Sequence, residues 1–236
     1  RKGHVMSKLA FIFPGQGAQK AGMGKDFYEN SEAARSFFDQ AQKILDFDLK
    51  EMCFGEHEEL NLTEYTQPCM VSVCLAIVQE LKKRGITPDI TAGLSLGEYA
   101  AVAAAGGMNE LDAIKLVRRR GILMQSTVPA GEGAMAAVLG LDAKKIEEIL
   151  ENFENVWIAN YNCPGQIVIT GLTNEVQQAS LALKEAGAKR VVELKVSGPF
   201  HSLLLKPAGE ALLKEMESMS FSPLQVPYVA NATAEV

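Results

Sequence analysis

The segment Gly93-Leu-Ser-Leu-Gly97 limits the possible folds of this chain more than any other feature, because it links an expected strand directly to an expected helix. Thr87-Pro-Asp89 ends a preceding helix, Ile90–Leu94 has the apolar character of a short buried strand, and Glu98–Gly106 predicts a helix of small residues. Glycine on both sides of the turn leaves room for a backbone that bends sharply back on itself. Ser95, at the centre, therefore lies on a strand, turn and helix in the order of a nucleophile elbow.

Ser95 has a second interpretation, as an ordinary helix N-cap. Ser95-Leu-Gly-Glu98 fits the capping box, in which the serine and glutamate side chains each accept a hydrogen bond from the other residue's backbone N–H. The two interpretations are compatible, because the N-terminus of a helix also presents N–H groups and a positive dipole to a developing oxyanion. The sequence leaves both open.

The composition is that of a globular protein. With 236 residues, 47% hydrophobic and 22% charged, the chain can form one large or two small domains. The net charge of −6 and the lack of a long basic run argue against a nucleic-acid partner. No apolar run reaches membrane-spanning length and no hydrophobic signal segment is visible, so we expect a cytoplasmic protein with no membrane partner. Residues 1–5 are expected to be a cloning remnant, with His4 in it, ahead of a natural start at Met6.

The cysteine pattern agrees with a reducing compartment. The four cysteines show neither CxxC spacing nor the density of a disulfide scaffold, and we expect them to be small buried apolar residues. They are Cys53, Cys69, Cys74 and Cys163.

Strands and helices alternate through the first half of the chain. Lys8–Phe13 predicts a strand that stops at the turn Pro14-Gly-Gln-Gly17, Gln67-Pro68 is expected to open a helix, and Leu111–Ser126 predicts another. Near the end, Val226–Asn231 predicts a further strand. This alternation favours a mostly parallel sheet covered by helices on both faces.

The pattern changes between the two halves of this α/β unit. Strand, helix, strand, strand, helix and strand follow one another, which is the βαββαβ order of a ferredoxin-like subdomain. The expected elements are 134–139, 143–153, 156–161, 166–170, 174–186 and 190–196. We therefore predict a large domain of residues 6–130 and 198–236 with an inserted subdomain of residues 131–197.

His201 is the candidate base for a serine nucleophile, because a serine hydroxyl needs a neighbouring group to take its proton. The chain has 3 histidines, of which His57 lies in an acidic stretch where exposure is expected. His201 instead follows an expected strand and a Gly-Pro loop, although a structural capping role for it is the alternative. Asp112 and Asp142 lie between Ser95 and His201 in the sequence, and a dyad is as plausible as a triad.

Helical geometry separates the three arginines of Arg118-Arg-Arg120. The positions three and four residues from Arg120 are apolar, whereas Arg118 and Arg119 point about 160° and 100° away from it and are interpreted as solvated. The apolar positions are Leu116, Val117, Leu123 and Met124. A guanidinium on a buried face needs an anionic partner, and a protein carboxylate and a substrate carboxylate are equally suitable.

The turn Pro14-Gly-Gln-Gly17 resembles a phosphate loop only superficially. The lysine and the third glycine that such loops need are absent at the required spacing. In a hydrolase-type site, one oxyanion donor is the amide after the nucleophile, here Leu96, and a second comes from a separate loop. Gln16 is placed to supply that second amide.

Five motifs in this order closely resemble the malonyl-CoA:acyl-carrier-protein transacylases of fatty-acid synthesis. They are Pro14-Gly-Gln-Gly17, Thr66-Gln-Pro68, Gly93-Leu-Ser-Leu-Gly-Glu-Tyr99, Arg120-Gly121 and Gly198-Pro-Phe-His-Ser202. The resemblance spans nearly the whole chain from Met6 and implies an α/β-hydrolase-like large domain with a ferredoxin-like insertion. It also implies a role for each of seven residues: Ser95 as nucleophile, His201 as base, the Gln16 and Leu96 amides as oxyanion hole, Arg120 on the malonyl carboxylate, and Gln67 and Phe200 at the substrate.

The resemblance further implies a ping-pong acyl transfer from malonyl-CoA to the phosphopantetheine thiol of an acyl carrier protein. We expect no permanently bound cofactor, no metal and a monomer, with Lys189 and Arg190 as a docking patch for the acidic carrier. Family members often have histidine where Leu94 stands, and they continue past Val236 with a glutamine that orients the histidine base. A serine hydrolase or thioesterase, and a catalytically silent carrier-binding fragment, are the alternatives.

Overall fold

The computed structural model describes residues 8–129, 131–196 and 198–236, so the expected start at Met6 lies outside the described residues. The chain divides into two compact units, one made of residues up to Gly121 with Glu215–Val236, and the other of Ile122–Lys214. Two helices, α6 (Glu110–Thr127) and α9 (Lys206–Glu217), begin in one unit and end in the other. The second unit contains the segment 131–197 and adds the end of α6 and residues 198–214.

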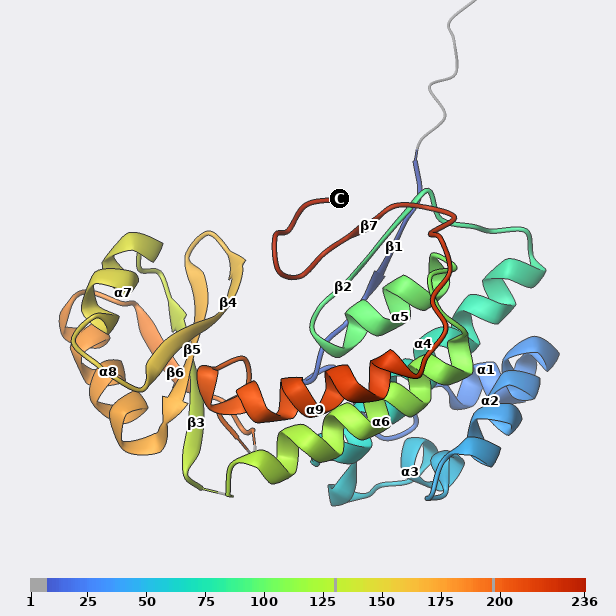
Figure 1. The fold of residues 1–236 in the computed structure, drawn as a ribbon, viewed down its shortest axis with the longest axis horizontal. Helices are drawn as coiled ribbons and strands as arrows, with labels where there is room; N and C mark the ends of the chain where they lie inside the picture. Colours follow the sequence, from blue (N-terminus) through green and yellow to red (C-terminus); the bar gives the residue numbers. More distant parts are fainter. Residues whose placement is uncertain (1–7, 130, 197) are drawn as a thin grey trace, which may run out of the picture. The chain divides into compact units, whose positions relative to one another are not determined.

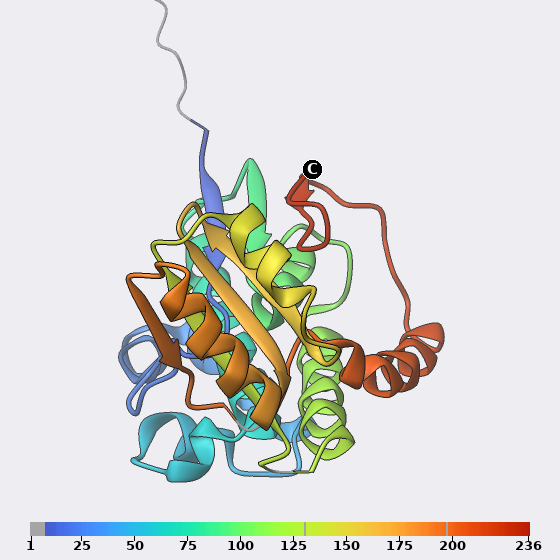
Figure 2. The same cartoon turned by 90° about the vertical axis from the view of Figure 1, so that its left-hand side faces the viewer.

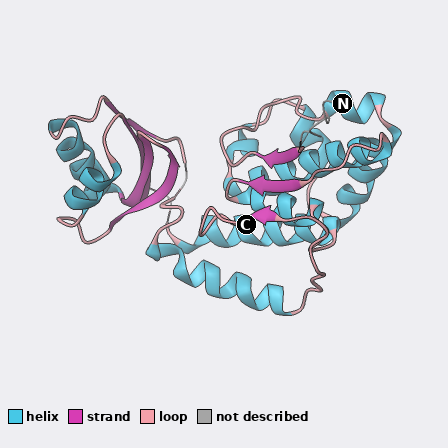
Figure 3. Ribbon diagram, turned by 90° about the horizontal axis from the view of Figure 1, so that it is seen from above, coloured by secondary structure: helices cyan, strands magenta, loops and turns pink. Residues whose placement is uncertain are grey.

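A short parallel sheet lies at the centre of the first unit (Figures 1 and 3). Its strands run in the order β1 (Ala10–Phe13), β2 (Ile90–Gly93) and β7 (Tyr228–Val229). Phe13 pairs with Gly93, and Ala92 pairs with Val229. Because parallel strands end at the same edge of a sheet, the segments that follow the three strands come together there.

Helix α5 packs against β1 and β2, and Figure 1 shows α4 and α5 beside the sheet. Ile12 of β1 is 76% exposed, so the predicted helical cover on both faces is incomplete at this strand. The helices of the first unit are α1 (Lys25–Asn30), α2 (Glu32–Ile44), α3 (Leu49–Phe54), a 3₁₀ turn (Glu58–Asn61), α4 (Thr63–Lys83) and α5 (Leu96–Ala104). Helix α2 buries one stripe at the spacing of a helix face, Ala34, Phe37, Phe38 and Ala41. Helix α4 is buried on most of its surface, which makes it the central helix of the unit.

Helix α4 begins earlier than predicted, at Thr63, and Pro68 lies inside it. Proline has no N–H, so the carbonyl of Glu64, four residues earlier, lacks its usual intrahelical donor. That carbonyl instead accepts a hydrogen bond from Nη1 of Arg118 at 2.8 Å. A donor from α6 thus allows the helix to continue through a proline that the sequence pattern interprets as a helix start.

The second unit has an antiparallel sheet with helices on one face (Figure 2). The strands lie in the order β4-β5-β3-β6. In chain order its elements are β3 (Gly133–Leu139), α7 (Ala143–Leu150), β4 (Val156–Cys163), β5 (Gln166–Leu172), α8 (Thr173–Glu185) and β6 (Arg190–Glu193), followed by a 3₁₀ turn (Leu203–Leu205) before α9. The predicted order of strands and helices is confirmed.

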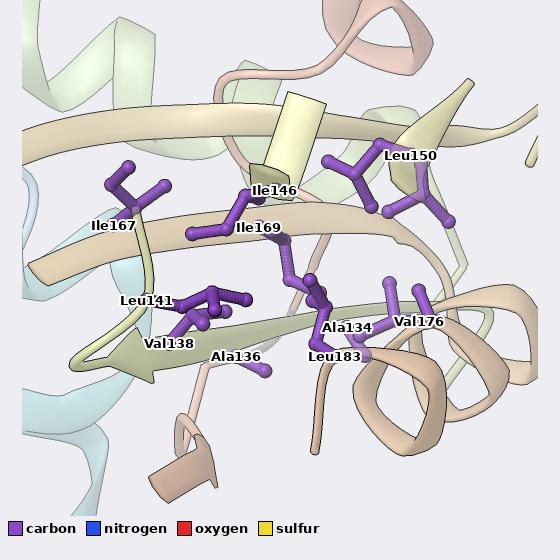
Figure 4. Packing of buried hydrophobic residues seen from close by; sticks show 12 residues of the cluster. Ala134, Ala136, Val138, Leu141, Ile146, Leu150, Ile167, Ile169, Val176 and Leu183 are labelled. Atoms are coloured by element: carbon purple, nitrogen blue, oxygen red, sulfur yellow. The ribbon is translucent and has the colours of Figure 1, made fainter. Parts of the chain in front are cut away.

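The two central strands of this sheet, β5 and β3, are buried on both faces. Alternate residues of β3 point toward α7 and α8, as strand geometry requires, and pack there with apolar residues of β5 and both helices (Figure 4). The labelled members are Ala134, Ala136, Val138, Leu141, Ile146, Leu150, Ile167, Ile169, Val176 and Leu183. On the opposite face, Met135 and Val168 pack against Phe200 and Leu205. None of the helices in the described ranges has both the length and the apolar character needed to cross a membrane.

The cysteines are free thiols, and their burial follows the prediction only in part. Cys53 and Cys69 are fully buried and Cys74 is partly buried. Burial raises the pKa of the Cys74 thiol to about 11. Cys163 is exposed at the end of β4, so the expectation of burial is wrong for it.

Candidate active site

The turn between β2 and α5 holds Ser95 in a strained conformation, with φ 53° and ψ −109°. Non-glycine residues with positive φ are uncommon, and at functional sites such strain is part of how a side chain is presented. A Cβ added at Gly97 would lie 2.5 Å from the carbonyl oxygen of Phe13, and one at Gly93 would collide with the Gly97 backbone. The predicted need for glycine on both sides of the serine is confirmed.

The Ser95 side chain makes no capping hydrogen bond to α5. Its Oγ instead accepts a hydrogen bond from Nη2 of Arg120 at 3.0 Å. The Ser95 N–H donates to Oδ1 of Asn231, and Oε1 of Glu98 accepts from the backbone N–H of Asn231. The capping-box interpretation is therefore wrong, because both of its hydrogen bonds are replaced by bonds to other elements.

Arg120 extends from α6 to the elbow and is partly buried, whereas the helical spacing predicts only that it lies on the inner face of its helix. Nη1 of Arg120 donates to Oε1 of the buried Gln67 at 2.7 Å, and the guanidinium carbon lies 5.4 Å from the centre of the Tyr99 ring. Burial lowers the pKa of Arg120, while Tyr99 and the charge of Glu98 act in the opposite direction. Among the described residues, no carboxylate forms an ion pair with Arg120.

The first two turns of α4 hydrogen-bond both to the loop that carries Gln16 and to Arg120. Thr63 Oγ1 accepts a hydrogen bond from Nε2 of Gln16 at 3.1 Å, and Gln67, one turn later, holds Arg120. The loop carrying Gln16 also lies against the elbow, because a Cβ at Gly15 would be 2.9 Å from the Leu94 carbonyl oxygen. One helix end thus positions the loop after β1 and the arginine beside Ser95.

The backbone N–H groups of Gln16 and Leu96 are available as donors. Within the part of the chain that the structure describes, neither N–H donates to a protein acceptor. Leu96 is the first residue of α5, where the N–H has no partner inside the helix and the helix dipole is positive. A backbone N–H with no protein acceptor can donate to an oxyanion, and the assignment of these two amides to an oxyanion hole stays a prediction.

Arg118 is not the solvated residue that the charge run predicts. Its side chain is only 11% exposed, and it pairs with Asp46 through two hydrogen bonds of 2.9 Å and with Glu64 through one of 3.0 Å. The rings of Phe47 and Tyr65 pack edge to face against each other, and their centres lie 5.2 and 4.9 Å from its guanidinium carbon. The prediction for Arg118 is wrong because helical periodicity gives the direction of a side chain but not the neighbours that cover it.

His201 belongs to the second unit, in the turn before the last 3₁₀ segment. It is exposed and has a positive φ of 58°. The preceding Phe200 is 4% exposed and packs in the apolar cluster on the sheet, and Ser202 Oγ donates to the Pro199 carbonyl at 2.6 Å. A packed and hydrogen-bonded turn therefore presents the imidazole, while its pairing with Ser95 stays a prediction. His57, for which exposure is expected, is instead partly buried and contacts Glu51 at 3.0 Å.

Sequence reasoning missed Asn231, Thr63 and the buried role of Arg118. A signal for Asn231 was present, because a polar residue just past the last parallel strand must lie at the edge where the elbow begins. No comparable signal existed for Thr63, whose partner is 47 positions away in the sequence. Within residues 8–129, 131–196 and 198–236, no group of three or more His, Cys, Asp and Glu side chains is arranged to hold a metal ion.

Comparisons of sequence and of structure with known proteins all point to the same family. Residues 10–235 match the family described as acyl transferase domain. A relative from Bacillus subtilis, named malonyl CoA-acyl carrier protein transacylase, is 48% identical over 98% of this chain and 74% of its own length. The solved transacylase of the same name from Clostridium perfringens is 42% identical, with a TM-score of 0.93 over 97% of this chain and 73% of that one.

A second similar solved structure is a complex of a type II PKS acyl-carrier protein with its malonyl-transacylase. It is 39% identical to this chain, with a TM-score of 0.94 over 98% of this chain and 76% of the solved one. The family match covers almost the entire chain and agrees with the relatives in sequence and in structure. The chain belongs to the acyl transferase domain family.

Proposed function

We propose that this chain transfers a malonyl group from coenzyme A to the phosphopantetheine thiol of an acyl carrier protein, through a malonyl ester of Ser95. The observation that carries the proposal is the 3.0 Å hydrogen bond from Arg120 to Ser95 Oγ. It puts a guanidinium, with no ion pair to a described carboxylate, beside a serine held in an elbow. The names of the relatives from Bacillus subtilis and Clostridium perfringens support the same activity.

In the first half-reaction, Ser95 Oγ attacks the thioester carbonyl while His201 takes the hydroxyl proton. The carbonyl oxygen becomes an oxyanion that the N–H groups of Leu96 and Gln16 stabilise by hydrogen bonds. As the intermediate collapses, the carbon–sulfur bond breaks and His201 returns the proton to the coenzyme A thiolate. The product is malonyl-Ser95 and free coenzyme A thiol.

In the second half-reaction, the thiol of the carrier attacks the ester with His201 as base, and the Ser95 oxygen leaves and is protonated. Arg120 selects the acyl group because its planar fork can bind the terminal carboxylate through two hydrogen bonds. Gln67 fixes one nitrogen of that fork from a fully buried position. Phe200 stays a proposed residue of the substrate site, and its buried ring also anchors the His201 turn.

The carrier is the proposed partner because one structural relative is a complex of a malonyl-transacylase with an acyl-carrier protein. Lys189 and Arg190, both exposed at the start of β6, are the proposed docking patch for an acidic carrier. Charge reversal at both positions should weaken carrier binding and leave hydrolysis of malonyl-CoA unchanged. The expected monomeric state and cytoplasmic location stay predictions.

We further propose a fold type and an extent in the sequence for each of the two domains. The parallel sheet with an elbow after β2 supports an α/β-hydrolase-like large domain, for which residues 6–130 and 198–236 remain the proposed extent. The βαββαβ order and the strand order β4-β5-β3-β6 support a ferredoxin-like subdomain, with residues 131–197 as its proposed extent.

Intact-mass measurement after mixing with malonyl-CoA tests the proposed function. Wild type should gain one malonyl group, and Ser95→Ala should gain none. Transfer of that group to a carrier thiol rather than to water distinguishes the transferase from a serine hydrolase, and a catalytically silent binding module would show no mass change. Labelling of Ser95→Ala to the wild-type extent would rule out Ser95 as the nucleophile.

The role of Arg120 is tested by substrate competition. Arg120→Ala should lose the preference for malonyl-CoA over acetyl-CoA, because the carboxylate then has no cationic partner. Arg119→Ala, one residue away and half-exposed, is the matched control and should keep the wild-type ratio. An unchanged ratio in Arg120→Ala would remove Arg120 from the site.

A further inference from the structure

Asn231 lies at the edge of the parallel sheet where the elbow begins. It follows β7 by two residues, and β7 pairs with β2, which ends in the elbow (Figure 1). The side chain contacts both sides of Ser95. Oδ1 accepts a hydrogen bond from the Ser95 N–H at 2.7 Å, and Nδ2 donates to the carbonyl oxygen of Gly93.

A carboxamide is suited to these two partners. One is a donor and the other an acceptor, and asparagine presents an acceptor and a donor on a single planar group. The opposite orientation of the amide would place its NH₂ against the Ser95 N–H and its oxygen against the Gly93 carbonyl. The partners therefore fix the amide in the orientation observed.

A third contact ties Asn231 to the start of α5. The backbone N–H of Asn231 donates to Oε1 of Glu98 at 2.9 Å. Asn231 is thus bound to the last residue of β2, to Ser95 and to the first turn of α5. Gly93 lies before the backbone bend, Glu98 lies after it, and Ser95, with its strained φ of 53°, is at the bend itself.

Strained backbone persists only where the surroundings hold it in place. Without Asn231, the Ser95 N–H and the Gly93 carbonyl would lose the partners that define the direction of the peptides around Ser95. The Cα–Cβ bond, and with it Oγ, follows those peptides. A change of this kind displaces the nucleophile relative to the oxyanion donors while leaving substrate-binding groups in place.

We propose that Asn231 is a positioning residue, which fixes the elbow so that Ser95 Oγ is held for attack on the acyl carbonyl. This inference rests on the proposed function, because it needs Ser95 to be the nucleophile. It does not need Asn231 to contact substrate.

The experiment compares Asn231→Leu, which keeps the size of the side chain but cannot hydrogen-bond, with wild type. The rate of malonyl-Ser95 formation is measured by rapid quench and intact mass in a single turnover. We expect this rate to fall between about 10- and 100-fold, because a nucleophile misplaced by about 1 Å loses rate on this scale. The KM for malonyl-CoA should stay within about twofold, because the groups that bind the substrate do not move.

Asn155→Leu is the matched control. Asn155 also uses backbone and side-chain N–H groups to clamp a neighbour, Glu175, but it does so in the second unit. Its acylation rate should stay within about twofold of wild type at a temperature where both variants are fully folded. An equal loss in the two asparagine variants would mean that Asn231 acts only on stability, and would overturn the proposal.

Hydrogen exchange gives a measurement that needs no variant. The Ser95 amide should be protected in the folded wild type, because Asn231 Oδ1 accepts its hydrogen bond at 2.7 Å. Free exchange of that amide would overturn the inference even if the Asn231 variants do not fold. If wild type is acylated normally and Asn231→Leu is acylated at the same rate, the Asn231 proposal is overturned and the proposed function stands. If Ser95 of wild type is not labelled at all, the proposed function itself is overturned.

Discussion

The two units of this chain hold their backbones in place by different means. In the first unit, strands of 4, 4 and 2 residues provide few ladder bonds, and polar side chains such as Asn231 and Arg118 bind the backbone directly. In the second unit, β3 and β5 pair without interruption from Gly133↔Leu172 to Leu139↔Gln166 over an apolar core. Both units have an apolar core, but the short strands around the strained serine also depend on directional bonds from side chains to the backbone.

The largest expected effect comes from a methyl group at the elbow. In Gly93→Ala, the added Cβ would collide with the backbone of Gly97, which cannot move without displacing α5. We expect the free energy of unfolding to fall by about 4 kcal/mol or more, together with loss of Ser95 acylation. Urea unfolding and intact-mass labelling measure the two effects.

The matched substitution in the second unit is Gly209→Ala in α9. A Cβ there meets no atom within 4 Å, and alanine favours a helix over glycine by about 0.5–1 kcal/mol. We therefore expect a small gain in stability and unchanged acylation. A Gly93→Ala variant as stable as Gly209→Ala would show that the elbow is not tightly constrained.

The second expected effect tests the apolar unit. Ile169 is fully buried on β5, and Ile169→Ala removes three carbons from the core shown in Figure 4. We expect a loss of about 2–5 kcal/mol in the free energy of unfolding, with the acylation rate of the folded chain changed less than twofold. Leu181→Ala on α8, where the leucine is 60% exposed, should change stability by less than about 0.5 kcal/mol. Loss of acylation in folded Ile169→Ala would mean that core packing of this unit also sets the site.

The sequence predicted local features well and long-range polar contacts poorly. Gly-x-Ser-x-Gly signals the elbow because one of its causes, the close approach of Gly93 to the Gly97 backbone, lies within five positions. Arg120 follows from helical periodicity, which is also local. Asn231 reaches Ser95 across 136 positions, and its partners are backbone atoms that carry no residue-specific signal. The true start of α4 is hidden for the same reason, because the donor that rescues the carbonyl opposite Pro68 comes from another helix.

The third expected effect compares neighbouring arginines. Arg118→Ala should lower the free energy of unfolding by about 2 kcal/mol, because the Glu64 carbonyl opposite Pro68 and two carboxylates lose their donor. Arg118→Lys should recover little, because an ammonium cannot reproduce the bidentate pair with Asp46. Arg119→Ala removes an exposed pair with Glu215 and should cost less than about 1 kcal/mol. Equal effects in urea unfolding would show that the Arg118 contacts add nothing beyond a surface ion pair.

The smallest expected effect is a pH dependence present in both units. Hydrogen bonds from Arg118 lower the pKa of Asp46 from its ordinary value of 3.8, and hydrogen bonds from Asn155 lower the pKa of Glu175 from 4.5. A lowered pKa gives stability that is fully present above the ordinary value and is lost as the pH falls through the folded-state pKa. For Asp46, 66% exposed, screening by water keeps this contribution below about 1 kcal/mol.

Asp46→Asn and Glu175→Gln should each flatten the decline of unfolding free energy between about pH 5 and pH 2. Urea titrations followed by the single tryptophan, Trp157 of β4, report on the second unit, while far-ultraviolet circular dichroism reports on both. If the units unfold together, both substitutions change the same transition in both signals. If they unfold separately, only Glu175→Gln changes the tryptophan signal, and the difference between the two units extends to how they unfold. A steeper decline in Asp46→Asn than in wild type would contradict the stabilising pair with Arg118.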